Sequence, residues 1–134
     1  MIRATQAGAA YFAGMFALGF VLGTIRVMMI APVLGAWGAT FLELPVMLVV
    51  SWIYCRWLIR RFSVPTIGSA RVVMGTVAFA MLMVGEVLLG IGLFDRTLTA
   101  QVRDMTSGPG LAGLAGQVAF ATFPWVQFRF AERG

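Results

Sequence analysis

The sequence has no histidine and no lysine, a single cysteine and few charged residues. Without histidine, the chain lacks the usual axial ligand of haem and the general base of Ser–His and Cys–His nucleophile systems. Without lysine, it cannot form a Schiff base with retinal or pyridoxal phosphate. Cys55 has no second cysteine with which to form a disulfide, and its place within an apolar run predicts a packed, buried side chain. We therefore expect no cofactor, no metal site and no catalytic side chain.

Charge is scarce in this chain. Only 11% of the 134 residues are charged, whereas 60% are hydrophobic. A water-soluble domain of this size could not cover so much apolar surface, so the composition indicates a membrane protein. The ten basic residues, all arginines, outnumber the five acidic ones and give a net charge of +5. Because they bracket the apolar runs instead of forming one basic face, we expect the lipid bilayer, and no nucleic acid, as the anionic partner.

Four apolar runs are long enough to cross a hydrocarbon core of roughly 30 Å as helices. They cover residues 7–30, 37–58, 72–94 and 111–128. We therefore predict an all-α fold, a bundle of four transmembrane helices in a single domain over residues 1–134. The first run is too long for the core of a cleaved signal peptide, so we expect it to be retained.

The connections and helix contacts also leave signals in the sequence. A proline and a glycine within residues 31–35 are typical of a helical hairpin, and residues 98–105 predict a short surface helix. Gly19 and Gly23 form a G-x-x-x-G pair, which predicts a close approach of another helix to the first run.

The arginines predict the orientation of the chain, because short loops rich in Arg remain on the cytoplasmic side. With four spans, both termini and the second loop share one side, and that side holds most of the arginines. We therefore expect the N- and C-termini to be cytoplasmic. Arg60 and Arg61 in the second loop are candidates for binding lipid headgroups.

Arg56 lies at the cytoplasmic end of the second predicted span. Three other charged side chains fall deeper inside the predicted spans, where charge is costly: Arg26, Glu43 and Glu86. Arg26 and Glu43 lie at similar distances on either side of the first hairpin. At 1.5 Å per residue they should face each other at one depth and form an ion pair. Glu86 and Gln117 reach the same depth on the third and fourth spans. The pattern predicts one polar layer to which each helix contributes one residue.

In this layer two carboxyls share one guanidinium. If Glu43 pairs with Arg26, Glu86 is left among apolar side chains near a like charge, which favours its protonated form. Our first hypothesis is therefore a non-enzymatic protein with proton- or ion-coupled small-solute transport or channel-like activity. An accessory or assembly subunit with a purely structural polar layer is an alternative, and a membrane enzyme acting on a lipid-like substrate is a third. Four short helices leave little room for a solute path, so we expect a homo-oligomer or another membrane protein as partner.

One stretch of the sequence resembles a known group of proteins. Residues 41–48 (FLELPVML), continuing through Ser51-Trp52 to residues 56–62 (RWLIRRF), are similar to a segment of small, uncharacterised four-helix proteins of the bacterial inner membrane. The similarity extends over most of the chain and includes Arg71 and Glu86. The resemblance implies a multi-pass protein of the bacterial inner membrane, and it implies no mechanism.

Overall fold

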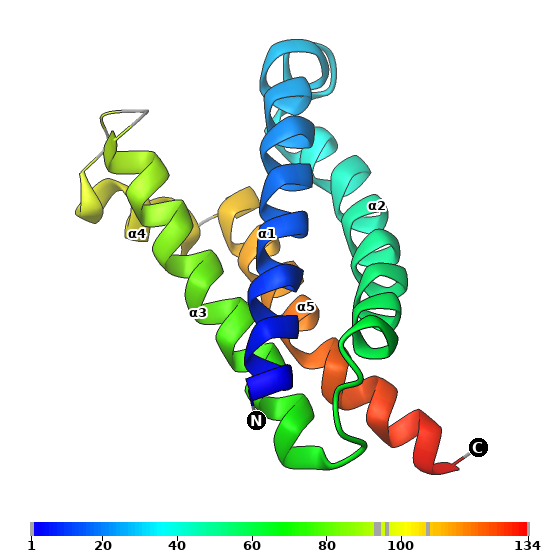
Figure 1. Ribbon diagram of the computed structural model, residues 1–134. Coiled ribbons are helices and arrows are strands. Elements are labelled where there is room, and N and C mark those ends of the chain that lie inside the picture. Colours follow the sequence, from blue (N-terminus) through cyan, green and yellow to red (C-terminus); the bar gives the residue numbers. More distant parts are fainter. Residues whose placement is uncertain (1, 93–94, 96, 107, 134) are drawn as a thin grey trace.

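The computed structural model describes residues 2–92, 95, 97–106 and 108–133, and all the secondary structure within these ranges is helical. The elements in chain order are α1 (Ile2–Ile25), the π-helical turn η1 (Arg26–Ile30), α2 (Ala31–Arg61), α3 (Gly68–Gly92), α4 (Leu98–Met105) and α5 (Gly108–Arg133). Helices α1 and α5 each pack against both α2 and α3, so they lie diagonally opposite in a bundle of four long helices (Figure 1). The predicted all-α class is confirmed.

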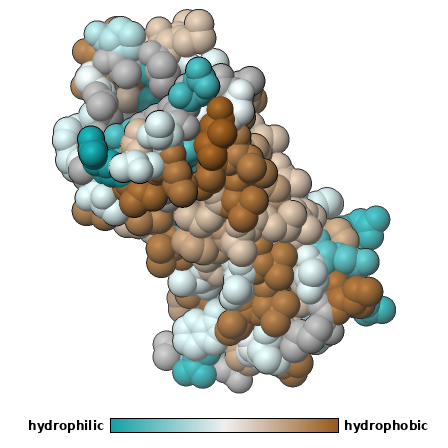
Figure 2. All heavy atoms as spheres, turned by 90° about the vertical axis from the view of Figure 1, so that its left-hand side faces the viewer, coloured by the Kyte–Doolittle hydropathy of each residue, from teal (hydrophilic) through white to brown (hydrophobic). Residues whose placement is uncertain are grey.

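Three helical stretches are long and apolar enough to cross a membrane. They are Ile2–Ile30, Trp37–Arg61 and Gly68–Gly92. The fourth predicted span falls on α5, where glycines, glutamines and Pro124 dilute the apolar residues, and within the described ranges α5 is not among these stretches. Figure 2 shows apolar side chains over the middle of the α3 and α4 face and hydrophilic ones towards its ends. A membrane protein is thus supported, while the fourth span and the orientation of the termini stay predictions.

The chain reverses between α1 and α2 without an intervening loop. The turn η1 follows α1 directly, and α2 has Pro32 in its first turn, where a missing N–H costs no helical hydrogen bond. Gly35 has φ +78° and ψ 170°, a backbone conformation open mainly to glycine, and it interrupts the helix. The hairpin predicted at residues 31–35 is therefore a kinked helical turn.

Helix α2 ends in a Schellman motif. The N–H of Val64 donates to the carbonyl of Ile59 (3.0 Å), and the N–H of Ser63 donates to that of Arg60 (3.3 Å). Ser63 adopts the left-handed conformation that this motif needs, with φ +50°. Val64 is buried, and Pro65 follows it and prevents the helix from continuing. These bonds fix the turn between α2 and α3.

Two glycines allow a close backbone approach between α3 and a neighbouring helix. A Cβ atom added to Gly75 would lie 2.0 Å from the carbonyl oxygen of Ala121 in α5, and one added to Gly8 in α1 would lie 2.6 Å from that of Met74. Any side chain at these two glycines would collide with a backbone that cannot rotate away. Glycine is therefore required where α3 contacts α1 and α5.

The predicted close approach at Gly19 and Gly23 is wrong. Within the described part of the chain, a Cβ on Gly19 would meet only the end of the Met47 side chain, at 3.5 Å, and one on Gly23 only a guanidinium nitrogen of Arg26, at 3.8 Å. Among the described residues, no backbone of another helix lies within 4 Å of either added Cβ, and Gly19 instead lines a cavity between the helices.

A proline-freed carbonyl joins α1 to α5. Pro124 has no N–H, so the carbonyl of Phe120 lacks its usual helical donor. The hydroxyl of Tyr11, which is fully buried, donates to this carbonyl at 2.9 Å, and the Tyr11 and Phe120 rings stack with centroids 4.0 Å apart. A second tyrosine, Tyr54, links α2 to α1 by donating to the carbonyl of Ala10 at 2.9 Å, although no proline frees that carbonyl.

The surface helix predicted at residues 98–105 is confirmed as α4. Thr97 caps its start, because the Thr97 side chain accepts a hydrogen bond of 3.1 Å from the backbone N–H three residues on. Gln101 donates to the carbonyl of Val87 in α3 at 3.4 Å, and the absence of a side chain at Gly90 makes room for it. Residues 93–94, the predicted end of the third span, lie outside the described residues.

Candidate functional site

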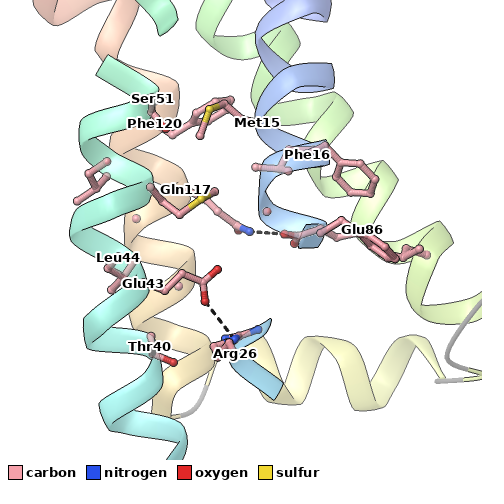
Figure 3. A pocket seen from close by; sticks show the side chains of 18 residues that line it. Met15, Phe16, Arg26, Thr40, Glu43, Leu44, Ser51, Glu86, Gln117 and Phe120 are labelled. Atoms are coloured by element: carbon pink, nitrogen blue, oxygen red, sulfur yellow. Dashed lines mark hydrogen bonds and ion pairs between the residues drawn. The ribbon is translucent and has the colours of Figure 1, made fainter. Parts of the chain in front are cut away.

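A cavity of about 260 Å³ lies between α1, η1, α2, α3 and α5. Its walls are mostly apolar, but four elements each bring one strongly polar side chain to it: η1 brings Arg26, α2 Glu43, α3 Glu86 and α5 Gln117 (Figure 3). The four residues predicted to share one layer are therefore brought together around a single space. Their action as a functional site stays a prediction.

Arg26 and Glu43 form the ion pair that the sequence predicted. The Nε atom of Arg26 lies 3.1 Å from Oε2 of Glu43, and the two side chains are 38% and 17% exposed. Arg26 Nε is nonetheless buried without a properly directed hydrogen bond to any described residue. The contact thus places opposite charges close together but leaves the Nε–H group of Arg26 without an aligned acceptor.

Glu86 is paired with an amide instead of a cation. The Nε2 atom of Gln117 donates a hydrogen bond to Oε1 of Glu86, as Figure 3 shows. The other end of the amide, Oε1 of Gln117, is buried and has no hydrogen-bond partner within the described residues. With both carboxyls ionised, one positive and two negative charges line the cavity, so it carries one surplus negative charge.

The position of Arg26 depends on a local irregularity of the helix. Arg26 is the first residue of η1, directly after α1 ends at Ile25. A π-helical turn contains more residues than an α-helical turn and changes the direction of the side chains in it, and such turns are frequent at functional sites. Apolar periodicity carries no signal for such a turn.

Thr40 belongs to the site and was missed in the sequence. Thr40 is only 4% exposed and lines the cavity, and its hydroxyl has no hydrogen-bond partner within the described residues. A threonine in an apolar helix is common, so composition alone does not single it out. The signal that could have found it is spacing, because Thr40 precedes Glu43 by three residues and so shares its face of α2.

Arg60 and Arg61 lie apart from this site. Both are exposed at the end of α2, and neither lines the cavity. Their binding of lipid headgroups stays a prediction. Cys55 also takes no part in the cavity, and its predicted burial is confirmed, because no part of its surface is exposed.

Comparisons with protein-family models, with curated proteins and with solved structures find no match. The resemblance carried by residues 41–62 therefore stays a prediction. Function is inferred from the chemistry of the cavity alone.

Proposed function

We propose that this protein is a four-span membrane protein in which the cavity binds a small solute and couples its movement to a proton on Glu86. The observation that carries the proposal is the cavity itself. It is bounded by the three stretches apolar enough to cross a membrane, and yet it is lined by one guanidinium and two carboxyls. Ionisable groups at such a position are costly, and in membrane proteins they usually mark solute or proton pathways.

Glu86 is the group best suited to exchange a proton. Glu43 has the guanidinium of Arg26 beside it, whereas Glu86 has only the neutral amide of Gln117. That amide can serve both states of the carboxyl. Its NH2 group donates to a carboxylate, and after rotation its oxygen accepts from a carboxylic acid. Loss or gain of a proton at Glu86 therefore needs no new partner.

The arrangement of the bundle supports α5 as the fourth span. The start of α1, the connection between α2 and α3 and the end of α5 lie at one end of the bundle, and η1 lies at the other (Figure 1). An even number of crossings requires this placement. The hydropathy of α5 is weak partly because the helix contains glutamines. One of them, Gln117, faces the cavity, where a polar side chain is not exposed to lipid.

Proton flux in liposomes tests the proposal. The protein is reconstituted with a pH-sensitive dye inside the vesicles. Flux is driven by a potassium diffusion potential, first alone and then with a panel of small amines, alcohols and carboxylates added outside, because a strictly coupled pathway moves protons only while solute moves. We expect flux above that of protein-free vesicles, and we expect Glu86→Gln to abolish the excess. Asp95→Asn is the matched control, because it removes an exposed carboxyl outside the cavity and asparagine tolerates the φ of +54° found there.

Two outcomes contradict the proposal. Equal flux from wild type and Glu86→Gln would remove Glu86 from the pathway. Wild-type flux no greater than that of protein-free vesicles would refute transport and favour the accessory or assembly role, which copurification with a second membrane protein at fixed stoichiometry would then establish.

A further inference from the structure

The cavity has more hydrogen-bond acceptors than the chain satisfies. Oε1 of Gln117, which can only accept, is buried without a partner within the described residues, and the carboxylate of Glu86 receives one amide N–H. The hydroxyl of Thr40, which can accept as well as donate, is also buried without a partner there. One donor, Nε of Arg26, is also unaligned, but its charge is already matched by Glu43. A buried polar atom without a partner costs about 1–3 kcal/mol. The unpartnered Gln117 oxygen and the carboxylate of Glu86 therefore favour a guest that donates hydrogen bonds.

The charges lead to the same conclusion. Arg26, Glu43 and Glu86 are the charged side chains among the cavity residues, and together they leave one negative charge uncompensated when both carboxyls are ionised. An anionic guest would add a second uncompensated charge. A monocation would neutralise the first.

The volume and the walls restrict the rest of the guest. A cavity of about 150 Å³ is enough to bind benzene, and drug-sized ligands occupy roughly 300–1,000 Å³. At about 260 Å³ this cavity suits an apolar body slightly larger than a single ring. Phe16, Phe20 and Phe120 are among its walls, and aromatic rings attract cations as well as apolar groups.

We propose that the cavity binds a primary ammonium compound with a small apolar body, its ammonium group beside the hydrogen-bonded Glu86 and Gln117 side chains and its body against the phenylalanines. The ammonium N–H groups donate to the Glu86 carboxylate and to Oε1 of Gln117. This inference deepens the proposed function and rests on it for the coupling. A proton and an ammonium group neutralise the same carboxylate, so the ammonium binds only when Glu86 releases its proton to water. Movement of the ammonium compound is thereby exchanged for movement of a proton.

The test compares probes that share one phenylethyl body. Binding of radiolabelled 2-phenylethylammonium, neutral 2-phenylethanol and anionic phenylacetate is measured by equilibrium dialysis against the full chain in phosphatidylcholine nanodiscs, with empty discs as background. We expect the ammonium to bind roughly tenfold more tightly than the alcohol, because charge-assisted hydrogen bonds are about twice as strong as neutral ones. Phenylacetate should bind most weakly. The trimethylated ammonium, which keeps the charge but has no N–H, should bind several-fold more weakly than the primary ammonium.

Variants locate the binding in the cavity. We expect Glu86→Gln to bind the ammonium no better than the alcohol, whereas Asp95→Asn keeps the wild-type preference. Addition of phosphatidylethanolamine, whose headgroup is a primary ammonium, distinguishes two sources of the same chemistry. If phosphatidylethanolamine competes with 2-phenylethylammonium, the natural guest of the cavity is a lipid headgroup. If it does not compete, the guest is a free amine.

The proposal is overturned if phenylacetate binds as tightly as the ammonium, if the trimethylated probe binds equally well, or if Glu86→Gln keeps the ammonium preference. The order of the probes on the wild-type protein is decisive even if Glu86→Gln does not fold. Failure of the two inferences can be told apart. Proton flux through Glu86 without ammonium binding refutes only the ammonium guest, and ammonium binding without flux refutes only transport.

Discussion

Replacement of Gly75 by alanine should separate α3 from α5. The added Cβ would lie 2.0 Å from the carbonyl oxygen of Ala121, and real Cβ atoms do not approach closer than 3.0 Å. The two backbones must therefore move apart by about 1 Å. A carbonyl oxygen inside a helix has no rotamer to change, so the whole contact between the helices has to shift.

The size of the effect follows from two opposing terms. Overpacking of a close contact costs about 1–3 kcal/mol, and the upper end applies here because the obstacle is backbone. Alanine in place of glycine within a helix stabilises the helix by about 1 kcal/mol. The shift also strains the bond of Tyr11 to the Phe120 carbonyl, since Phe120 adjoins Ala121. We expect Gly75→Ala to lose about 2 kcal/mol of stability.

The assay is an unfolding titration with sodium dodecyl sulfate in mixed micelles, followed by far-ultraviolet circular dichroism. Gly113→Ala is the matched control, because a Cβ there meets nothing within 4 Å in the described part of the structure. Gly113→Ala should gain up to about 1 kcal/mol of stability, because alanine favours the helical conformation more than glycine does. If Gly75→Ala were as stable as Gly113→Ala, α3 and α5 would not approach as described.

The same titration tests three further contacts. Tyr11→Phe leaves the Phe120 carbonyl without a donor and should cost about 1–3 kcal/mol, and unchanged stability would show that this carbonyl finds another partner. Ser63→Gly should gain about 1 kcal/mol, because glycine adopts the φ of +50° without steric cost, and a loss would contradict the Schellman turn. Gly8→Ala should be destabilising and Gly19→Ala should not, because an added Cβ would meet backbone at 2.6 Å in the first case and a flexible side-chain end at 3.5 Å in the second. The reverse order would restore the G-x-x-x-G prediction.

Much of the polar layer could be predicted by counting along the chain. Arg26 and Glu43 are equally far from the first turn, and a constant rise per residue then brings them to one depth. The observed ion pair follows from that arithmetic. Glu86 and Gln117 reach the same depth for the same reason, and the structure joins them by a hydrogen bond.

The contacts between helices could not be predicted in this way. Gly19 and Gly23 matched a packing motif, but the close approaches occur at Gly8 and Gly75. A motif on one helix does not specify the partner or the rotation of the helix about its axis. Both depend on side chains distant in sequence.

The sequence by itself therefore determined the all-helical class, the position of α4 and the depth of the polar residues, because hydropathy and helical rise are local properties of the chain. The tertiary structure alone decided that the Gln117 amide donates to Glu86, that the Tyr11 hydroxyl donates to the carbonyl freed by Pro124, and that Thr40 faces a cavity. These features arise where four helices meet, and their geometry is set by packing among residues that are far apart in the sequence.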